Sequence, residues 1–306
     1  MSSTPHKPTL IVIVGPTASG KTGLAIDLAS YFRTEIISAD SRQFYHEIPI
    51  GTAAPTPEQL VKVRHHFVGQ RSILEDYNVS RFEKEVLELL AEKFEEKEVM
   101  VMVGGSGLYI NAVCKGIDDL PDPEPALREE LNAIFQQKGI SALQELLKQL
   151  DPEYFEQVDQ NNPKRLLRAL EVCRQTGKKY SDLRLDKPIE RNFNILKIGL
   201  EVDRKLLVQR INQRTDKMLQ QGWLEEAKTV FPYHHLNALN TVGFKELFMY
   251  LDGEWTLEQA IEKIKINTRR YAKRQMTWFR KDPDIHWFSP DDKEGILTFI
   301  DEIEED

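Results

Sequence analysis

Three short apolar runs stand out in the first third of the chain, and each is followed by a polar loop and a helix-like segment. The runs are Thr9–Val14, Glu35–Ala39 and Val99–Val103. An apolar run bounded by turn residues is typical of a strand buried on both faces. Strands that alternate with helices predict an α/β fold with a parallel sheet. Ligands of such sheets bind beyond the carboxyl ends of the strands.

The pattern becomes helical after a Pro-rich linker that begins at Asp118. Helix-like segments without a strand among them follow at 124–138, 141–150, 152–158 and 161–176. Phe193–Leu200 is again apolar, and we expect it to rejoin the sheet. The chain is therefore predicted to consist of an α/β core, residues 1–118 and 193–306, and a helical insertion, residues 119–192. The remainder is predicted to be mostly helical, at 203–221, 222–230, 243–251 and 256–281.

Residues 40–80 show little periodicity, and Pro and Gly residues punctuate them, although a strand is possible at His66–Gly69. A segment of this length is more often a loop that covers a substrate than a simple connection. An amphipathic helix is predicted after it at Ser80–Lys97, with Ser80 as the N-cap and Glu83 as the capping-box partner.

The loop after the first strand reads Gly15-Pro-Thr-Ala-Ser-Gly20-Lys21-Thr22, which has the spacing GxxxxGK[ST]. The glycines let the backbone curl so that several N–H groups face one point, and the next helix adds its positive N-terminal end. Lys21 supplies a charge for a terminal phosphate, and the Thr22 hydroxyl is placed to ligate Mg²⁺. The stretch predicts a site for a diphosphate or a triphosphate.

Two further polar motifs follow strands, and we expect all three to meet in one crevice. In Ser38–Gln43, Asp40 could hold Mg²⁺ or accept a proton from a nucleophile. The alternative for Asp40 is a turn or N-cap residue. The glycine-rich Gly104–Tyr109 lets the backbone approach a ligand and presents the Ser106 hydroxyl.

The charged residues are unevenly distributed in this acidic chain, whose net charge is −8. Lys263–Lys281 contains eight Lys or Arg residues and no acid. We expect its aromatic residues to pack inward and its cations to follow a nucleic-acid backbone. Arg210 and Arg214 share a helix face, which suits either a leaving pyrophosphate or a solvated surface.

The composition, 41% hydrophobic and 29% charged residues, is ordinary for a globular protein. No apolar run approaches the length of a membrane span. The two cysteines, Cys114 and Cys173, and the seven histidines show no metal-ligand spacing. A cytoplasmic location is the expectation that follows.

Five stretches, in family order and over almost the whole chain, resemble the bacterial tRNA dimethylallyltransferases. They are Gly15–Thr22, Ser38–Gln43 with Ile50–Ala53, Val103–Tyr109, Arg165–Val172 and Thr268–Arg280. The first is shared with many nucleotide-binding proteins, whereas the second and the last are close to diagnostic. Two positions depart from the family pattern: Ser106 stands where Thr is usual, and Phe244 where Tyr is usual.

The resemblance implies a P-loop NTPase-like core that transfers a dimethylallyl group from dimethylallyl diphosphate to an adenosine beside the tRNA anticodon. Asp40 would act as the general base, Arg214 and Ser106 would stabilise the leaving group, and Mg²⁺ would be the cofactor, with Thr22 as its ligand. The residues implied to bind the diphosphate are Gly15, Thr17, Ala18, Ser19, Gly20, Lys21 and Thr22. Those implied to contact the tRNA anticodon stem-loop are Asp40, Ser41, Arg42, Gln43, Arg128, Lys164, Arg165, Arg168, Lys273, Arg274, Gln275 and Arg280.

Three alternatives remain from the residues alone. The chain could prenylate free adenine nucleotides, it could be a small-molecule kinase that binds ATP in the same loop, or it could bind RNA without catalysis. The intact Lys21, Thr22 and Asp40 argue against the last. The expected form is a monomer.

Overall fold

The apolar runs form one parallel sheet in the computed structural model, which describes residues 7–118, 120–184 and 187–305. Its strands are β1 (Thr9–Val14), β2 (Ile36–Ser38), β3 (His65–His66), β4 (Val99–Val103), β5 (Asn194–Leu200) and β6 (Ile285–Phe288). Their order is β3-β2-β4-β1-β5-β6, and every neighbouring pair is parallel. The predicted α/β core is confirmed.

Contacts between Cα atoms divide the chain into two units. The first comprises Met1–Cys114 and Arg191–Asp306, and the second comprises Lys115–Glu190. The predicted insertion, residues 119–192, begins four residues after the first residue of the second unit and ends two residues after its last residue.

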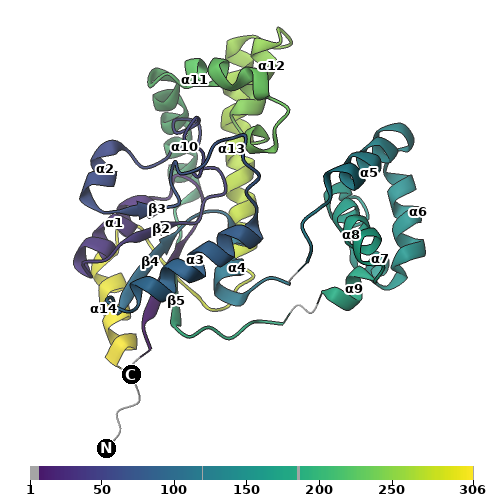
Figure 1. Ribbon diagram of the computed structural model, residues 1–306. Coiled ribbons are helices and arrows are strands. Elements are labelled where there is room, and N and C mark those ends of the chain that lie inside the picture. Colours follow the sequence, from purple (N-terminus) through teal and green to yellow (C-terminus); the bar gives the residue numbers. More distant parts are fainter. Residues whose placement is uncertain (1–6, 119, 185–186, 306) are drawn as a thin grey trace, which may run out of the picture. The chain divides into compact units, whose positions relative to one another are not determined.

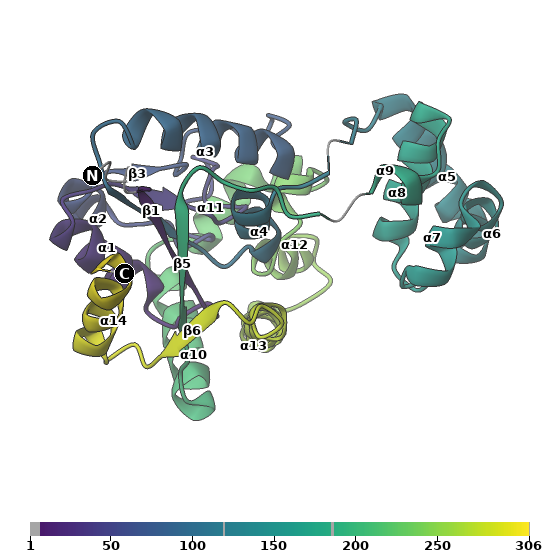
Figure 2. The same cartoon turned by 90° about the horizontal axis from the view of Figure 1, so that it is seen from below.

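Helices cover both faces of the sheet, as the apolar strands require. On one face lie α3 (Val79–Lys93) and α4 (Gly107–Lys115), which share a core with β1, β2 and β4. On the other face lie α1 (Lys21–Tyr31) and α14 (Lys293–Glu305), packed on the alternate residues of the same strands. Figure 2 shows α3 and α14 on opposite sides of the strands. The central strands β1, β2 and β4 are thereby shielded from water on both faces.

Four helices of the first unit build a third core beyond the sheet. They are α10 (Arg204–Gln220), α11 (Trp223–Val230), α12 (Phe244–Leu251) and α13 (Leu257–Phe279), with short 3-10 turns at Phe231–Tyr233 and Asn237–Leu239. Ile48 and Ile73, from the segment without clear periodicity, are buried in this core. Figure 1 shows α11 and α12 at the far end of α10 and α13. The segments before and after β3 are thus held against helices that are distant in sequence.

The second unit is helical within its described residues and has its own core. It contains α5 (Pro125–Lys138), α6 (Ile140–Leu150), α7 (Pro152–Gln157), α8 (Pro163–Thr176) and α9 (Tyr180–Leu183). Asp151, fully buried, accepts hydrogen bonds from the backbone N–H groups of Tyr154 and Ser181 and from the Ser181 hydroxyl. Buried acceptors satisfied in this way fix the packing of neighbouring helices.

Three expectations about local structure are corrected. Helix α3 begins at Val79, and its N-cap is Asn78, whose side chain accepts from the Arg81 N–H; Ser80 lies inside the helix. The segment 40–80 contains an unexpected helix, α2 (Pro57–Lys62), and its edge strand β3 spans His65–His66, where a strand at His66–Gly69 was possible. The C-terminal part adds strand β6 and helix α14. β6 was missed because His286 and Trp287 interrupt its apolar pattern.

No helix among the described residues is long and apolar enough to cross a membrane. Cys114 and Cys173 are both buried, and neither forms a disulfide.

Replacing the observed cap should destabilise α3, whereas replacing the expected cap should not. Asn78→Ala removes the side-chain acceptor and should cost about 1 kcal/mol of local stability. Ser80→Ala, the matched control, should change stability by less than about 0.5 kcal/mol. Hydrogen exchange of the α3 amides measures both effects, and equal protection in the two variants would contradict the assigned cap.

Candidate active site

The phosphate loop lies between β1 and α1, at the centre of the sheet. Gly20, the N-cap of α1, has a φ of 98°, a left-handed conformation that suits glycine. No side chain caps the first N–H groups of α1, so they remain available to a ligand. The Lys21 ammonium donates to the Pro16 carbonyl at 2.7 Å, which folds the side chain back over the loop. The loop therefore has the form of an anion site.

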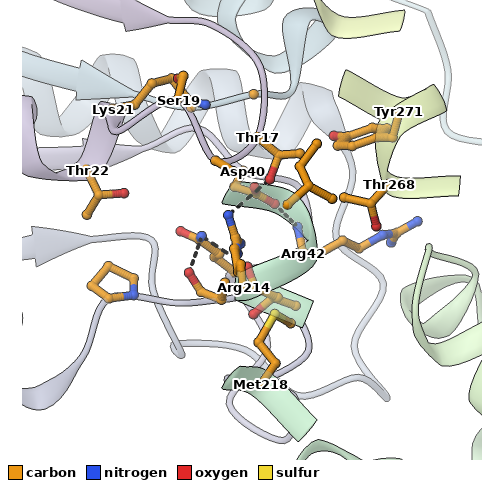
Figure 3. A pocket seen from close by; sticks show the side chains of 18 of the residues that line it. Thr17, Ser19, Lys21, Thr22, Asp40, Arg42, Arg214, Met218, Thr268 and Tyr271 are labelled. Atoms are coloured by element: carbon orange, nitrogen blue, oxygen red, sulfur yellow. Dashed lines mark hydrogen bonds between the residues drawn. The ribbon is translucent and has the colours of Figure 1, made fainter. Parts of the chain in front are cut away.

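A cavity of about 510 Å³ lies over the carboxyl ends of the strands and includes this loop. Asp40, Arg42 and Gln43 after β2, and Gly104 and Gly105 after β4, also line it. The predicted convergence of the three strand-end motifs is thus confirmed. Helices from the third core close the cavity on its other side, with Arg210, Ile211, Arg214, Thr215 and Met218 from α10 and Thr268, Tyr271 and Gln275 from α13. Figure 3 shows Arg214 reaching toward Thr17 and Asp40, with Tyr271 opposite.

Two largely desolvated cations, Lys21 and Arg214, share the cavity with the Asp40 carboxylate, and Arg42 and Arg210 also line it. Desolvation lowers the pKa of Lys21 to about 7; the nearby Arg214 acts in the same direction and Asp40 in the opposite one. Desolvation also lowers the pKa of Arg214. The Arg214 guanidinium donates to the Thr17 hydroxyl at 3.0 Å, which aims it at the loop. Because two like charges share a poorly solvated space, a polyanion bound between them is strongly favoured.

Asp40 shapes a turn and also lines the cavity, so its position is compatible with both interpretations that the sequence left open. Its Oδ1 accepts a hydrogen bond of 3.0 Å from the Arg42 N–H, so the residue shapes the turn after β2. The carboxylate also lines the cavity and acts on the pKa values of Lys21 and Tyr271 across it. A carboxylate in this position can accept a proton from a bound substrate.

Ser106 is not among the residues that line the cavity, and its expected role at the leaving group stays a prediction. Its hydroxyl accepts from the Ser41 N–H at 2.9 Å and donates to the Ser41 hydroxyl at 3.2 Å. The hydroxyl therefore positions the segment that carries Asp40. Ser41 is likewise outside the cavity lining, whereas the Gln43 amide spans from the Ser38 hydroxyl to the Thr52 and Ala53 carbonyls.

Gln275, expected on the basic surface, is only 6% exposed and joins two loops of the site. Its Oε1 accepts from the Thr17 N–H at 2.8 Å, and its Nε2 donates to the Gly105 carbonyl at 3.0 Å. Both polar ends of the amide thus bond to protein, and the expected contact of Gln275 with tRNA stays a prediction. Gln275 also lines the cavity.

The other expected tRNA residues lie on both units. Lys273, Arg274 and Arg280 are exposed on or just after α13, and Arg280 pairs with Glu201. In the second unit, Lys164 and Arg165 are exposed in the first turn of α8. Arg128 forms a two-pronged pair with Glu171, and Arg168 donates to the Pro121 carbonyl at 2.9 Å. Arg128 and Arg168 thus stabilise their own unit through these contacts.

Sequence reasoning missed Glu226 on α11. Its carboxylate accepts from the Ile50 and Gly51 N–H groups at 2.8 and 2.7 Å, and it holds the loop whose residues 51–53 line the cavity. Burial raises the pKa of Glu226, and these hydrogen bonds oppose the rise. Nothing local in the sequence marks it, because its partners lie about 175 residues away. Thr268 and Tyr271 were detectable, since they share the helical spacing of Gln275.

The residues present fit a magnesium ion that is held mainly by the phosphate oxygens of a bound substrate and by water. The described residues contain no group of three or more His, Cys, Asp or Glu that could enclose a metal. Mg²⁺ usually takes few protein ligands and fills its other positions with phosphate oxygens and water. The Thr22 hydroxyl and the Asp40 carboxylate, both hard oxygen donors, line the same cavity.

Fold and cavity together define a phosphate-loop α/β protein with a site for a phosphorylated ligand. The family model described as IPP transferase matches residues 43–282. The tRNA dimethylallyltransferase 2 of Parabacteroides distasonis is 51% identical over 292 residues, which cover 95% of this chain and 98% of that protein. The tRNA dimethylallyltransferase 1 of Bacteroides fragilis is also 51% identical and covers 95% and 97%. The chain belongs to the IPP transferase family.

Solved structures agree over the length of the chain. The tRNA isopentenylpyrophosphate transferase of Bacillus halodurans superimposes with a TM-score of 0.72 at 36% identity, covering 98% of this chain and 97% of that one. A eukaryotic dimethylallyltransferase captured acting on tRNA gives a TM-score of 0.77 at 28% identity, covering 93% and 74%. The P-loop NTPase-like fold expected from the sequence is thus confirmed.

Binding of a diphosphate should take up a proton above pH 7, because a ligand anion favours the charged form of Lys21, whose pKa is about 7 without ligand. Affinity for inorganic pyrophosphate should therefore fall as the pH rises from 7 to 9, by up to about tenfold per unit. Calorimetry in two buffers of different ionisation enthalpy measures the uptake. In the Lys21→Arg control, the guanidinium stays charged over this pH range, so the proton uptake that Lys21 contributes should vanish. Equal uptake in both proteins would refute the assignment to Lys21.

Proposed function

We propose that this protein transfers a dimethylallyl group from dimethylallyl diphosphate to the exocyclic amine of the adenosine 3′ to the anticodon of tRNA, releasing pyrophosphate. Family membership supports the reaction class. The observation that carries the proposal is the shared cavity of a phosphate loop and Asp40, because it brings a diphosphate site and a proton acceptor together. We further propose that the enzyme acts as a monomer in the cytoplasm, where its tRNA substrate is found.

The residues of the cavity suit each part of the reaction. Lys21, Arg214 and the backbone N–H groups of the loop would bind the diphosphate and stabilise charge on it as the carbon–oxygen bond breaks. The amine nitrogen forms the new bond to the allylic carbon, and Asp40 accepts the proton that the nitrogen loses. An amine conjugated with a purine ring is a poor nucleophile, so removal of this proton as the bond forms is needed. When bound, Mg²⁺ would offset charge on the diphosphate, with the Thr22 hydroxyl as its protein ligand.

The alternatives fit less well. An enzyme that prenylates free adenine nucleotides needs neither a helical unit nor the acid-free run Lys263–Lys281. A kinase would use ATP in the same loop, and the relatives at 51% identity are named dimethylallyltransferases. ATP consumption without RNA would favour the kinase, and label on free AMP would favour the nucleotide enzyme.

Loss of the Asp40 carboxylate should slow transfer by roughly 100-fold or more. Asp40→Asn is the informative change, because the amide oxygen can still accept from the Arg42 N–H and preserve the turn. Transfer of label from dimethylallyl diphosphate to unmodified tRNA measures the rate. The matched control, Asp27→Asn, removes an exposed carboxylate paired with Lys293 and should leave the rate unchanged. Label transfer at the wild-type rate by Asp40→Asn would reject the base while leaving the function intact.

Removal of divalent cations should abolish transfer, and added Mg²⁺ should restore it. Thr22→Val keeps the shape of the side chain without its oxygen and should raise the Mg²⁺ concentration for half-maximal rate at least about tenfold. Thr22→Ser retains the hydroxyl and should stay near wild type. Equal Mg²⁺ requirements in the two variants would rule out Thr22 as the ligand.

A further inference from the structure

One face of α13 continues from the cavity to the surface of the first unit. Thr268, Tyr271 and Gln275 line the cavity and are spaced by three and four residues, so they share a helix face. Trp278 lies three residues beyond Gln275 and continues this face. Trp278 does not itself line the cavity. The next side chain after the cavity wall is therefore an indole.

Trp278 is 40% exposed, contrary to the expectation that the aromatics of this stretch pack inward. Phe279 does pack inward and is 2% exposed. The indole is nevertheless held in place, because its edge rests on the backbone of Gly107 at the start of α4. A Cβ atom added to Gly107 would lie 2.2 Å from the Trp278 Nε1. The ring is thus an anchored apolar surface that is partly open to solvent.

The surroundings of this ring favour an anionic partner with flat apolar parts. Lys273, Arg274 and Lys281 are exposed on the same stretch, within a run that contains no acid. Leu108, directly after Gly107, is 51% exposed and adds apolar area. Single-stranded RNA combines phosphates with unstacked bases, and proteins bind such bases on exposed aromatic rings. An apolar protein segment would make no use of the cations.

We propose that Trp278, supported by Gly107 and flanked by Leu108, stacks on a nucleobase adjacent to the adenosine that enters the cavity. This proposal rests on the function proposed above. Three helical residues rise about 4.5 Å from Gln275 to Trp278, so the indole lies less than one helical turn beyond the cavity wall. A base next to the one in the cavity can therefore reach the indole without a large change in the backbone.

Stacking on Trp278 has an energetic purpose. A base drawn out of its stack leaves its neighbour with one face exposed, and this unstacking costs free energy. The indole would replace the lost neighbour. Because the ring is already held by Gly107, little conformational entropy is lost on binding.

The first test compares the binding of an unmodified anticodon stem-loop RNA to the wild-type protein and to four variants. Trp278→Ala should weaken binding roughly 10- to 100-fold, while Trp278→Phe should retain most of the affinity. Tyr31→Ala, the control, removes a 57% exposed aromatic from α1 and should have no effect. The salt dependence of binding should be unchanged in Trp278→Ala, since no charge is lost, whereas Lys273→Ala should reduce the slope by about 1.

The second test locates the base. Two stem-loops are used, each lacking the base on one side of the target adenosine. One of them should bind the wild-type protein more weakly than the intact stem-loop does. The same missing base should cause no further loss of affinity in Trp278→Ala. The KM for dimethylallyl diphosphate should not change in Trp278→Ala. Wild-type affinity in Trp278→Ala, failure of Trp278→Phe to rescue, or additive losses with every abasic RNA would each overturn the proposal. Failure of the proposed function would show differently, as absence of prenyl transfer to RNA by the wild type.

Discussion

One amide side chain connects the parts of the site that the chain supplies from its two ends. Gln275 accepts from Thr17 in the phosphate loop and donates to Gly105 after β4. Both bonds are made inside the protein, where an unpaired polar group is costly. The phosphate loop therefore takes its observed shape only when α13 is packed across the ends of the strands. Residues 258 positions apart in sequence depend on the same contact.

The charges of the cavity follow from this closure. Covering the loop with α10 and α13 removes water from Lys21 and Arg214, which lowers both pKa values. Asp40 compensates only part of the repulsion between the two cations. A diphosphate would supply the missing negative charge, and the same loss of water would strengthen its attraction to both residues. Folding thus leaves uncompensated positive charge in the cavity, which a bound diphosphate would neutralise.

The second unit shows that cations of one sequence pattern can have different tasks. Arg128 and Arg168 engage groups of their own unit, among them the buried Glu171, while Lys164 and Arg165 extend into solvent. All four looked equivalent in the sequence. A buried carboxylate needs paired donors, so part of a basic surface is used to stabilise the fold. The remaining exposed residues are those available to a phosphate backbone.

The sequence by itself determined the phosphate loop, the apolar strands and the meeting of three strand-end motifs, because each depends on local spacing and on the parallel order of strands. It also indicated Asp40 and Arg214 through their places after β2 and on one helix face. Only the tertiary structure decided that Ser106 holds Ser41, that Glu226 holds the loop at Gly51 and that Trp278 faces solvent. Those outcomes depend on which groups from distant parts of the chain pack against each side chain. No periodicity within a single element carries that information.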